Sequence, residues 1–237
     1  MTCCSAGIEQ GTFESLADHW QQILENSAEP TFFDSQTWQK TWWSEFGNDS
    51  ELQLIMVRSE SGEVNMIAPL MIDGSEISFL GSTDLVDYHD FLSRDRLSST
   101  CIQSLVSAVS QMSEIDTILL QSLPGNSPTI TQFREKAENA GWQVELEQED
   151  VAPRMDLPAS WDEYVSALRK KDRHELRRKL RRLEAVGEVN HVELSDPTDI
   201  ENSMADFIRL HRMSTPDKRA FMTTEREQFF CKIAIEL

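Results

Sequence analysis

The chain has 237 residues, of which 39% are hydrophobic, and its formal net charge is −19. Six tryptophans and eleven phenylalanines are enough for a folded core of one large or two small domains, so wholesale disorder is excluded. The acidic balance argues for solubility and against anionic membranes. No run approaches the roughly 20 apolar residues of a membrane span.

Targeting signals and cysteines point to a reducing compartment. The first segment, MTCCSAGIEQG, has neither the basic nor the apolar region of a secretory signal, so we expect a cytoplasmic protein. The four cysteines are Cys3, Cys4, Cys101 and Cys231. Adjacent Cys3 and Cys4 cannot form an ordinary bridge and lack the spacing of a zinc site. We therefore expect reduced thiols and no metal site.

Two amphipathic helices are expected first. Residues 12–26 carry apolar side chains at helical spacing, and Thr12 with Ser15 predicts an N-terminal cap. Residues 35–46 carry three tryptophans within six residues, and Gly47 ends that helix. Such an aromatic stripe favours a core anchor over a cofactor site.

A β-meander and a layered α/β domain follow. The three predicted meander strands are residues 51–58, 63–72 and 76–80, with turns at 61–62 and 73–74. Pro69 predicts an edge, a bulge or a strand end. Beyond the polar loop 81–90, we predict helix 97–112, strand 116–123, a helix from Ser127 or Pro128 to about residue 140, and strands 142–147 and 154–157. The order indicates a mixed sheet flanked by helices.

The second half, from about residue 158, reads as the opening of another α/β unit whose sheet is mostly missing. We predict a short helix capped by Ser160, a basic helix, a strand at 188–194, a helix from Asp196–Pro197 and a helix at 224–237. The apolar residues Phe229, Phe230, Ile233 and Ile235 have no visible partner in the sequence pattern. We therefore expect the C-terminal helix to expose apolar surface or to drive self-association.

The basic helix is the most distinctive feature. Residues 166–187 hold nine of the 22 Lys and Arg residues, which gives the segment a charge of about +6. Asp172 and Glu175 predict a capping box that opens the helix at Arg173, and apolar residues follow at helical spacing. Three interpretations stay open: a solvated helix or charge latch between two halves, a basic wall for a phosphate-bearing ligand, and nucleic-acid binding, which the acidic surroundings disfavour.

No strong catalytic signature is present, because the sequence has no GxSxG, P-loop, GxGxxG or HExxH motif. Two polar loops are candidates. In DLVDYHD, residues 84–90, Asp87 and Asp90 could orient a hydroxyl or amine acceptor, and Tyr88 could stack or donate a hydrogen bond; an acidic turn that satisfies its own backbone is the alternative. The second is HRMSTPDKRAF, residues 211–221, where His211 is a candidate base or a plain helix-end residue.

The combined pattern resembles a known family. It consists of F-x5-W-x3-WW, the strand ending in IAPLMI, FLGS…DYHD, SWDEYVSALRKKDRHELRRKLRRLEAVGEV, and LHRMS…KRAF…FF. In this order the motifs resemble the CelD-type (cellulose-biosynthesis-associated) acyltransferase family, which is related to the FemABX peptidyl transferases within the GNAT superfamily. The resemblance covers residues 12–237.

The resemblance implies an α/β fold in which a GNAT-like mixed sheet flanked by helices, residues 1–157, precedes the start of a second GNAT-like domain, residues 158–237. It implies an N- or O-acyltransferase with acetyl-CoA as co-substrate and a sugar, amine or envelope-polysaccharide precursor as acceptor. Candidate substrate-binding residues are Asp87, Tyr88, Asp90, Arg173, Arg177 and His211. Such proteins continue further, so a fragment is expected. A non-catalytic interaction module is the alternative, and neither nucleic acid nor a membrane span is expected.

Overall fold

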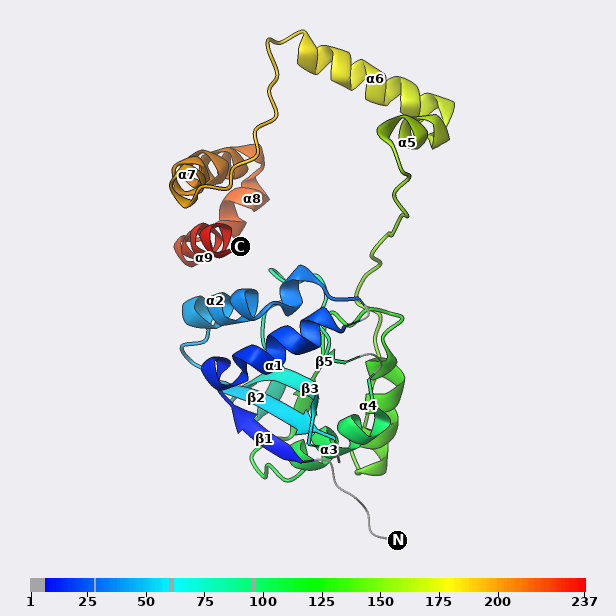
Figure 1. Cartoon of the computed structure of the whole chain (residues 1–237), viewed down its shortest axis with the longest axis vertical. Coiled ribbons are helices and arrows are strands. Elements are labelled where there is room, and N and C mark those ends of the chain that lie inside the picture. The colour runs from blue at the N-terminus through cyan, green and yellow to red at the C-terminus, as the bar shows by residue number, and fades with distance from the viewer. Residues whose placement is uncertain (1–6, 28, 60–61, 95–96) are drawn as a thin grey trace. The chain divides into compact units, whose positions relative to one another are not determined.

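Six strands form one mixed sheet in the computed structural model, which describes residues 7–27, 29–59, 62–94 and 97–237 (Figure 1). The strands are β1 (Ile8–Gly11), β2 (Glu51–Arg58), β3 (Val64–Asp73), β4 (Glu76–Phe79), β5 (Leu92–Ser93) and β6 (Thr117–Leu119). Their order is β1-β2-β3-β4-β6, and β5 pairs with β3. All pairs are antiparallel except β4 and β6, which are parallel. The predicted α/β class with a mixed sheet flanked by helices is confirmed.

Local signals set most helix boundaries. The helices are α1 (Phe13–Glu25), the 3-10 turn η1 (Phe32–Asp34), α2 (Gln36–Phe46), α3 (Ser99–Val109), α4 (Pro128–Asn139), α5 (Trp161–Ala167), α6 (Lys170–Glu184), α7 (Pro197–Ser214), α8 (Pro216–Phe221) and α9 (Thr224–Glu236). The predicted capping box of Thr12 and Ser15 opens α1. Ser35, Ser127 and Ser160 each accept a backbone N–H at the start of α2, α4 and α5. None of the described helices is long and apolar enough to cross a membrane.

The chain divides into two compact units. Residues 1–147 and 200–237 form the first, which we call the sheet unit, and residues 148–199 form the second, the basic-helix unit. This division differs from the boundary at 157 and 158 expected from sequence. The reason is that the C-terminal helices pack with the N-terminal sheet, although 52 residues separate the two parts of the unit in the chain.

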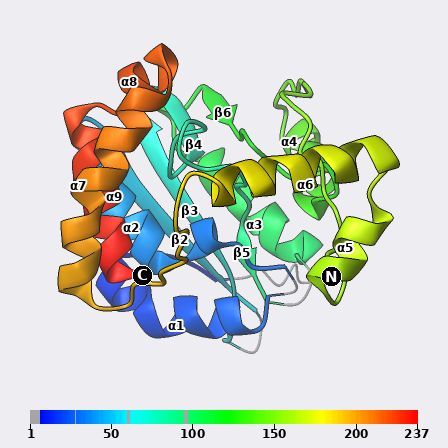
Figure 2. The same cartoon turned by 90° about the horizontal axis from the view of Figure 1, so that it is seen from above.

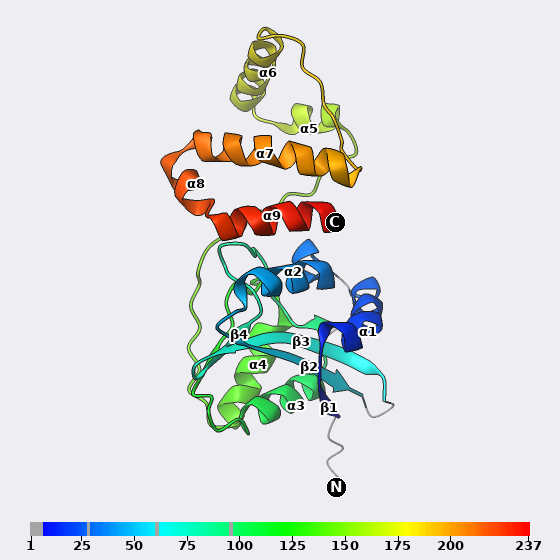
Figure 3. The ribbon, with the colours of Figure 1, turned by 90° about the vertical axis from the view of Figure 1, so that its left-hand side faces the viewer.

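Both faces of the sheet are covered. One core lies between the sheet and helices α3 and α4, and the other lies under α1, α2 and α9 (Figure 3). Strand β2 serves both, because its side chains alternate between faces. Ile55 and Val57 join the first core, whereas Leu54 and Met56 join the second.

Helix α9 lies along α2 within the sheet unit (Figures 2 and 3). Phe229 is fully buried, and its ring meets Trp38 edge-on at 5.0 Å between centroids and Phe46 at 5.6 Å. Ile233 is also buried. The expectation that this apolar helix lacks a partner was therefore wrong. The tryptophan-rich face of α2 is its partner, and burial there removes the reason for self-association through Phe229 and Ile233.

Three predicted strands are absent from the sheet. Residues 142–147, 154–157 and 188–194 run without strand pairing. Their alternating side chains fit a pleated strand, but an unpaired strand has no hydrogen-bonding partner to hold it. Strand β6, predicted over residues 116–123, also shortens to three residues.

Pro69 sits in the middle of β3 rather than at an edge, which corrects another expectation. Leu54 of β2 lies opposite it, and the carbonyl oxygen of Pro69 accepts the N–H of Leu80. A residue's N–H and C=O point to the same side of a strand, so the missing donor faces the side of β4 and β5. On that side Pro69 lies between the residues that pair with the two strands, because β5 pairs with residues 66–67 and β4 pairs with residues 70–73. The missing N–H therefore interrupts neither pairing.

Helix α6 begins three residues earlier than predicted. It spans Lys170–Glu184, and its N-cap residue Arg169 has no side-chain capping bond. Asp172 and Glu175 therefore lie inside the helix, so the predicted capping box is wrong. Glu175 instead binds Arg178 through Nη2 at 2.6 Å, one helical turn away.

Candidate functional site

The carboxyl ends of the parallel strands β4 and β6 carry the polar loop that the sequence singled out. The two strands are paired from Glu76 opposite Thr117 to Ser78 opposite Leu119. Beyond this register the backbone N–H of His89, from loop 81–90, donates to the carbonyl oxygen of Ser122 at 3.0 Å. Ligands of α/β sheets bind outside the carboxyl ends of parallel strands, so this is where the fold itself favours a site.

His89 is a packed residue of this loop. Its side chain is buried and stacks on Phe79, with ring centroids 5.3 Å apart and an interplanar angle of 18°. Gly81 lies against the imidazole, and a Cβ on Gly81 would come within 2.6 Å of His89 Nε2. Gly81 also has a φ of 140°, which side-chain-bearing residues rarely adopt. Glycine is therefore required where β4 leads into the loop.

Gly81→Ala is expected to destabilise the protein by about 2–3 kcal/mol, because alanine would be strained at this φ and would displace the imidazole of His89. Urea unfolding followed by circular dichroism measures the change. Gly125→Ala is the matched control, since a Cβ there meets no atom within 4 Å. Equal effects of the two substitutions would contradict the packing of His89 on Gly81.

Asp90 fastens the end of the loop to helix α4. Its carboxylate accepts hydrogen bonds from Ser127 Oγ and Thr129 Oγ1, each at 2.5 Å, and from the backbone N–H of Phe91 at 2.8 Å. Ser127 is also the N-cap of α4. Burial raises the pKa of Asp90, and these hydrogen bonds only partly oppose that increase.

Asp34, in η1, is a carboxylate that the sequence analysis missed. It accepts hydrogen bonds from the backbone N–H and the hydroxyl of Thr31 at 2.7 and 2.8 Å. Burial is the main cause that raises its pKa, and the negative charge of Asp90 raises it further. A carboxyl group from a distant segment of the chain therefore influences the pKa of Asp34. The T-x-x-D spacing of a capping box was the available signal for Asp34, but nothing in the sequence places it near Asp90.

Helix α9 fastens the other end of the loop. Arg226 Nη2 donates to Asp84 Oδ2 at 2.5 Å, and its guanidinium lies over the ring of Phe221, 4.2 Å from the centroid. Between the attachment points, Asp87 and Tyr88 are exposed. The chain therefore holds the loop at Asp84, His89 and Asp90 and presents the carboxylate and phenol at its apex.

The remaining predicted site residues lie elsewhere. His211, on α7, contacts the rings of Phe207 and Phe221. The centroid of its imidazole lies 6.0 Å from the centroid of each ring. Its Nδ1 is buried and has no hydrogen-bond partner among the described residues. Arg173 and Arg177 are on α6, in the basic-helix unit. Of the six candidates, the structure brings only Asp87, Tyr88 and Asp90 together on one loop.

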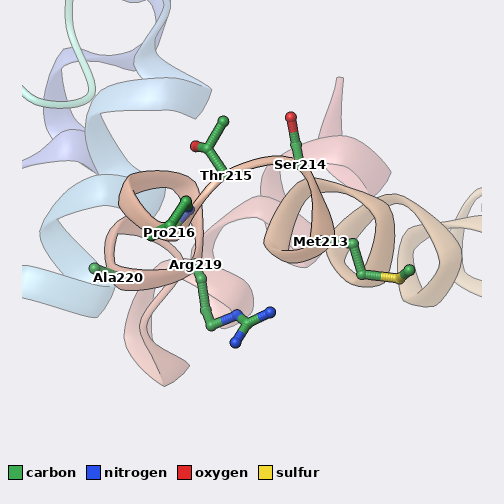
Figure 4. A pocket seen from close by; sticks show the side chains of 6 residues that line it. All are labelled: Met213, Ser214, Thr215, Pro216, Arg219 and Ala220. Carbon is green, nitrogen blue, oxygen red and sulfur yellow. The ribbon is translucent and has the colours of Figure 1, made fainter.

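A shallow hollow of about 340 Å³ lies at the turn between α7 and α8, within the second candidate segment (Figure 4). Its lining residues are Met213, Ser214, Thr215, Pro216, Arg219 and Ala220. Arg219 is the ionisable group among them, and its Nε donates to the Arg212 carbonyl oxygen at 3.4 Å. One guanidinium without an acid or base offers anion binding but no proton transfer. Within the described ranges, no group of three His, Cys, Asp or Glu side chains is arranged to hold a metal ion.

The chain was also compared with known proteins. No protein-family model matches it, and neither a curated protein nor a solved structure matches it.

Proposed function

We propose that the chain acts in acyl transfer, as an acyl-CoA-dependent N- or O-acyltransferase with acetyl-CoA as donor and a sugar, amine or envelope-polysaccharide precursor as acceptor. The motif resemblance suggests this reaction. The mixed sheet with helices on both faces is compatible with the GNAT-like layer that the resemblance implies. Its parallel pair, β4 and β6, supplies a carboxyl edge at which a substrate can bind.

The fastened loop is the observation that carries the proposal. Acyl transfer depends mainly on positioning of the acceptor and on stabilisation of the oxyanion, so it does not need a triad motif. The ion pair of Asp84 and the hydrogen bonds of His89 and Asp90 fix the loop before any substrate arrives. In this proposal Asp87 accepts a hydrogen bond from the acceptor hydroxyl or amine, and Tyr88 stacks on the acceptor or donates to it.

One observation favours a second candidate, an interaction module without catalysis. The polar groups of the first turn of α4 are already bound to Asp90, and His89 lies between the ends of β4 and β6. The carboxyl edge of the parallel pair is thus filled in part by the chain's own side chains. On this reading, exposed Asp87 and Tyr88 contact a protein partner instead of an acceptor.

Calorimetry with acetyl-CoA separates the two candidates. The acyltransferase proposal expects saturable heat, and Arg173→Ala with Arg177→Ala should weaken binding about 100-fold or more, because each of the two charge-assisted bonds to a phosphate contributes about 1.5–3 kcal/mol. Arg134→Ala is the matched control on α4 and should leave the affinity unchanged.

Asp87→Ala should also leave acetyl-CoA affinity unchanged, since Asp87 is assigned to the acceptor. No heat from folded protein would contradict the use of acetyl-CoA and favour the interaction module. If the natural chain binds acetyl-CoA but Arg134→Ala lowers its affinity as much as the double variant does, the role given to Arg173 and Arg177 would be contradicted.

A further inference from the structure

Helix α6 has two surfaces of opposite character. Its 15 residues include eight Lys or Arg and three Asp or Glu. Leu176, Leu180 and Leu183 follow at spacings of four and three, so they share one narrow stripe. The helix contains no buried residue. Leu180 and Leu183 are 39% and 52% exposed, which leaves much of the stripe uncovered.

The basic-helix unit has little core with which to cover that stripe. Val165 is the buried hydrophobic residue of residues 148–199. By contrast, Leu157, Trp161 and Val186 are 82%, 57% and 86% exposed. So much exposed apolar surface in a segment of 52 residues indicates a surface that binds something.

The cations of α6 are mostly not used inside their own unit. Among the described residues of this unit, the one ion pair of α6 joins Arg178 to Glu175. Arg173 donates to the carbonyl oxygen of Ser166 at 3.1 Å. The other guanidinium and ammonium groups of the helix are thus available to an anionic partner.

A partner for α6 has to be both anionic and apolar. A nucleic acid or another polyanion would bind the arginines and leave the leucines in water. A second α6 would cover the leucines, but it would bring two strongly cationic helices together over about two turns of stripe. An anionic lipid bilayer surface offers phosphate groups and acyl chains at neighbouring depths, so it satisfies both surfaces at once.

We propose that α6 binds in the surface of an anionic lipid bilayer, with Leu176, Leu180 and Leu183 at the acyl boundary and Arg181 and Arg182 at the lipid phosphates. Helix α5 contributes exposed Trp161, a residue type that favours the membrane–water interface. This is surface binding, and it requires no membrane-spanning helix. The chain's net charge of −19 does not prevent it, because at physiological salt charges beyond about 8 Å are largely screened.

Vesicle flotation with the full chain tests the proposal. Phosphatidylcholine vesicles containing phosphatidylglycerol should bind the chain at physiological ionic strength, pure phosphatidylcholine vesicles should not, and molar salt should release the chain. Arg181→Ala with Arg182→Ala should weaken binding about 30-fold, since each cation near an anionic surface contributes roughly fivefold. Leu180→Ser with Leu183→Ser should weaken it to a similar extent, about 30-fold, because both side chains lose their burial in the acyl boundary.

Arg134→Ala with Lys136→Ala is the matched control, because it removes the same charge from α4 in the sheet unit. It should change vesicle binding less than twofold, and circular dichroism should show that all variants stay folded. No flotation with anionic vesicles would overturn the proposal. Flotation that survives the leucine substitutions would overturn it too, in favour of a purely polyanionic partner. Binding of a synthetic acidic amphipathic helix without vesicle binding would identify a protein partner instead.

Discussion

Replacing Phe229 by alanine is expected to destabilise the sheet unit by about 3–5 kcal/mol, which is the usual cost of deleting a buried aromatic ring. The side chain is fully buried and fills the space between Trp38 and Phe46 on α2. Its loss leaves a cavity at the contact that joins the C-terminal helices to the sheet unit. Urea unfolding should show a lower midpoint, because the free energy of unfolding falls. Tryptophan fluorescence follows the transition, since Trp38 lies at this contact.

Ile235→Ala is the matched control on the same helix. Ile235 is 39% exposed, so its truncation should change the free energy of unfolding by less than about 1 kcal/mol. Lys232 also binds Glu45, and Glu236 accepts a hydrogen bond from Thr41 at 2.7 Å, and neither substitution removes these polar contacts. If Phe229→Ala and Ile235→Ala had equal effects, the packing of α9 on α2 would be wrong.

Asp90→Ala is the second substitution with a large expected effect, a loss of about 2–5 kcal/mol. It removes the acceptor of two short hydrogen bonds, and Ser127 and Thr129, which donate them, are 8% and 0% exposed. Each buried hydroxyl left without a partner costs about 1–3 kcal/mol. Asp90→Asn should cost less at neutral pH, because the amide oxygen accepts from one hydroxyl, the amide nitrogen can donate to the oxygen of the other, and no charge is buried.

The pH dependence of the free energy of unfolding separates the loss of the two hydrogen bonds from the cost of burying the charge of Asp90. Burial raises the pKa of Asp90 in the folded protein, so folding favours the protonated carboxyl. This contribution to stability is complete below the ordinary pKa of 3.8 and is lost as the pH rises through the raised folded value. Asp90→Asn lacks the ionisation, so its stability relative to the natural protein should improve as the pH rises through that window.

Urea unfolding at several pH values above and below the ordinary pKa of an aspartate measures this difference. Asp87→Asn is the control, because its side chain is exposed. Parallel pH curves for Asp90→Asn and the natural protein would contradict the burial of Asp90. Asp34 has a raised pKa for the same main reason and should contribute in the same direction.

Local chemistry made much of the fold predictable from sequence. Thr12, Ser35 and Ser127 cap helices through bonds to residues two or three positions away, so the signal and its partner lie within one turn. Strand β2 was predicted with its observed limits from the apolar side chains of residues 51–58 and from the hairpin turn that follows them. In these cases the neighbouring sequence contains everything that decides the structure.

Long-range partners decided the rest. The alternation in residues 188–194 indicates a strand but does not supply a partner, and the structure leaves the segment unpaired. Helix α2 covers Phe229, and no residue near position 229 in the sequence indicates this contact. For the candidate site, sequence identified the loop that carries Asp87 and Tyr88. It could not show that Asp84 is bound by Arg226, or that Asp90 lies close enough to Asp34 to raise the pKa of Asp34.

The packing of α9 on α2 has a consequence for synthesis of the chain on the ribosome. Phe229 follows Phe46 by 183 residues. At a translation rate of about 5–20 residues per second, the tryptophan face of α2 is made about 10–40 seconds before the helix that covers it. During this interval a nascent chain presents Trp38 and Trp42 to chaperones. Slow translation between these elements should therefore increase the demand for chaperones and the yield of aggregates, although the finished protein buries the same side chains.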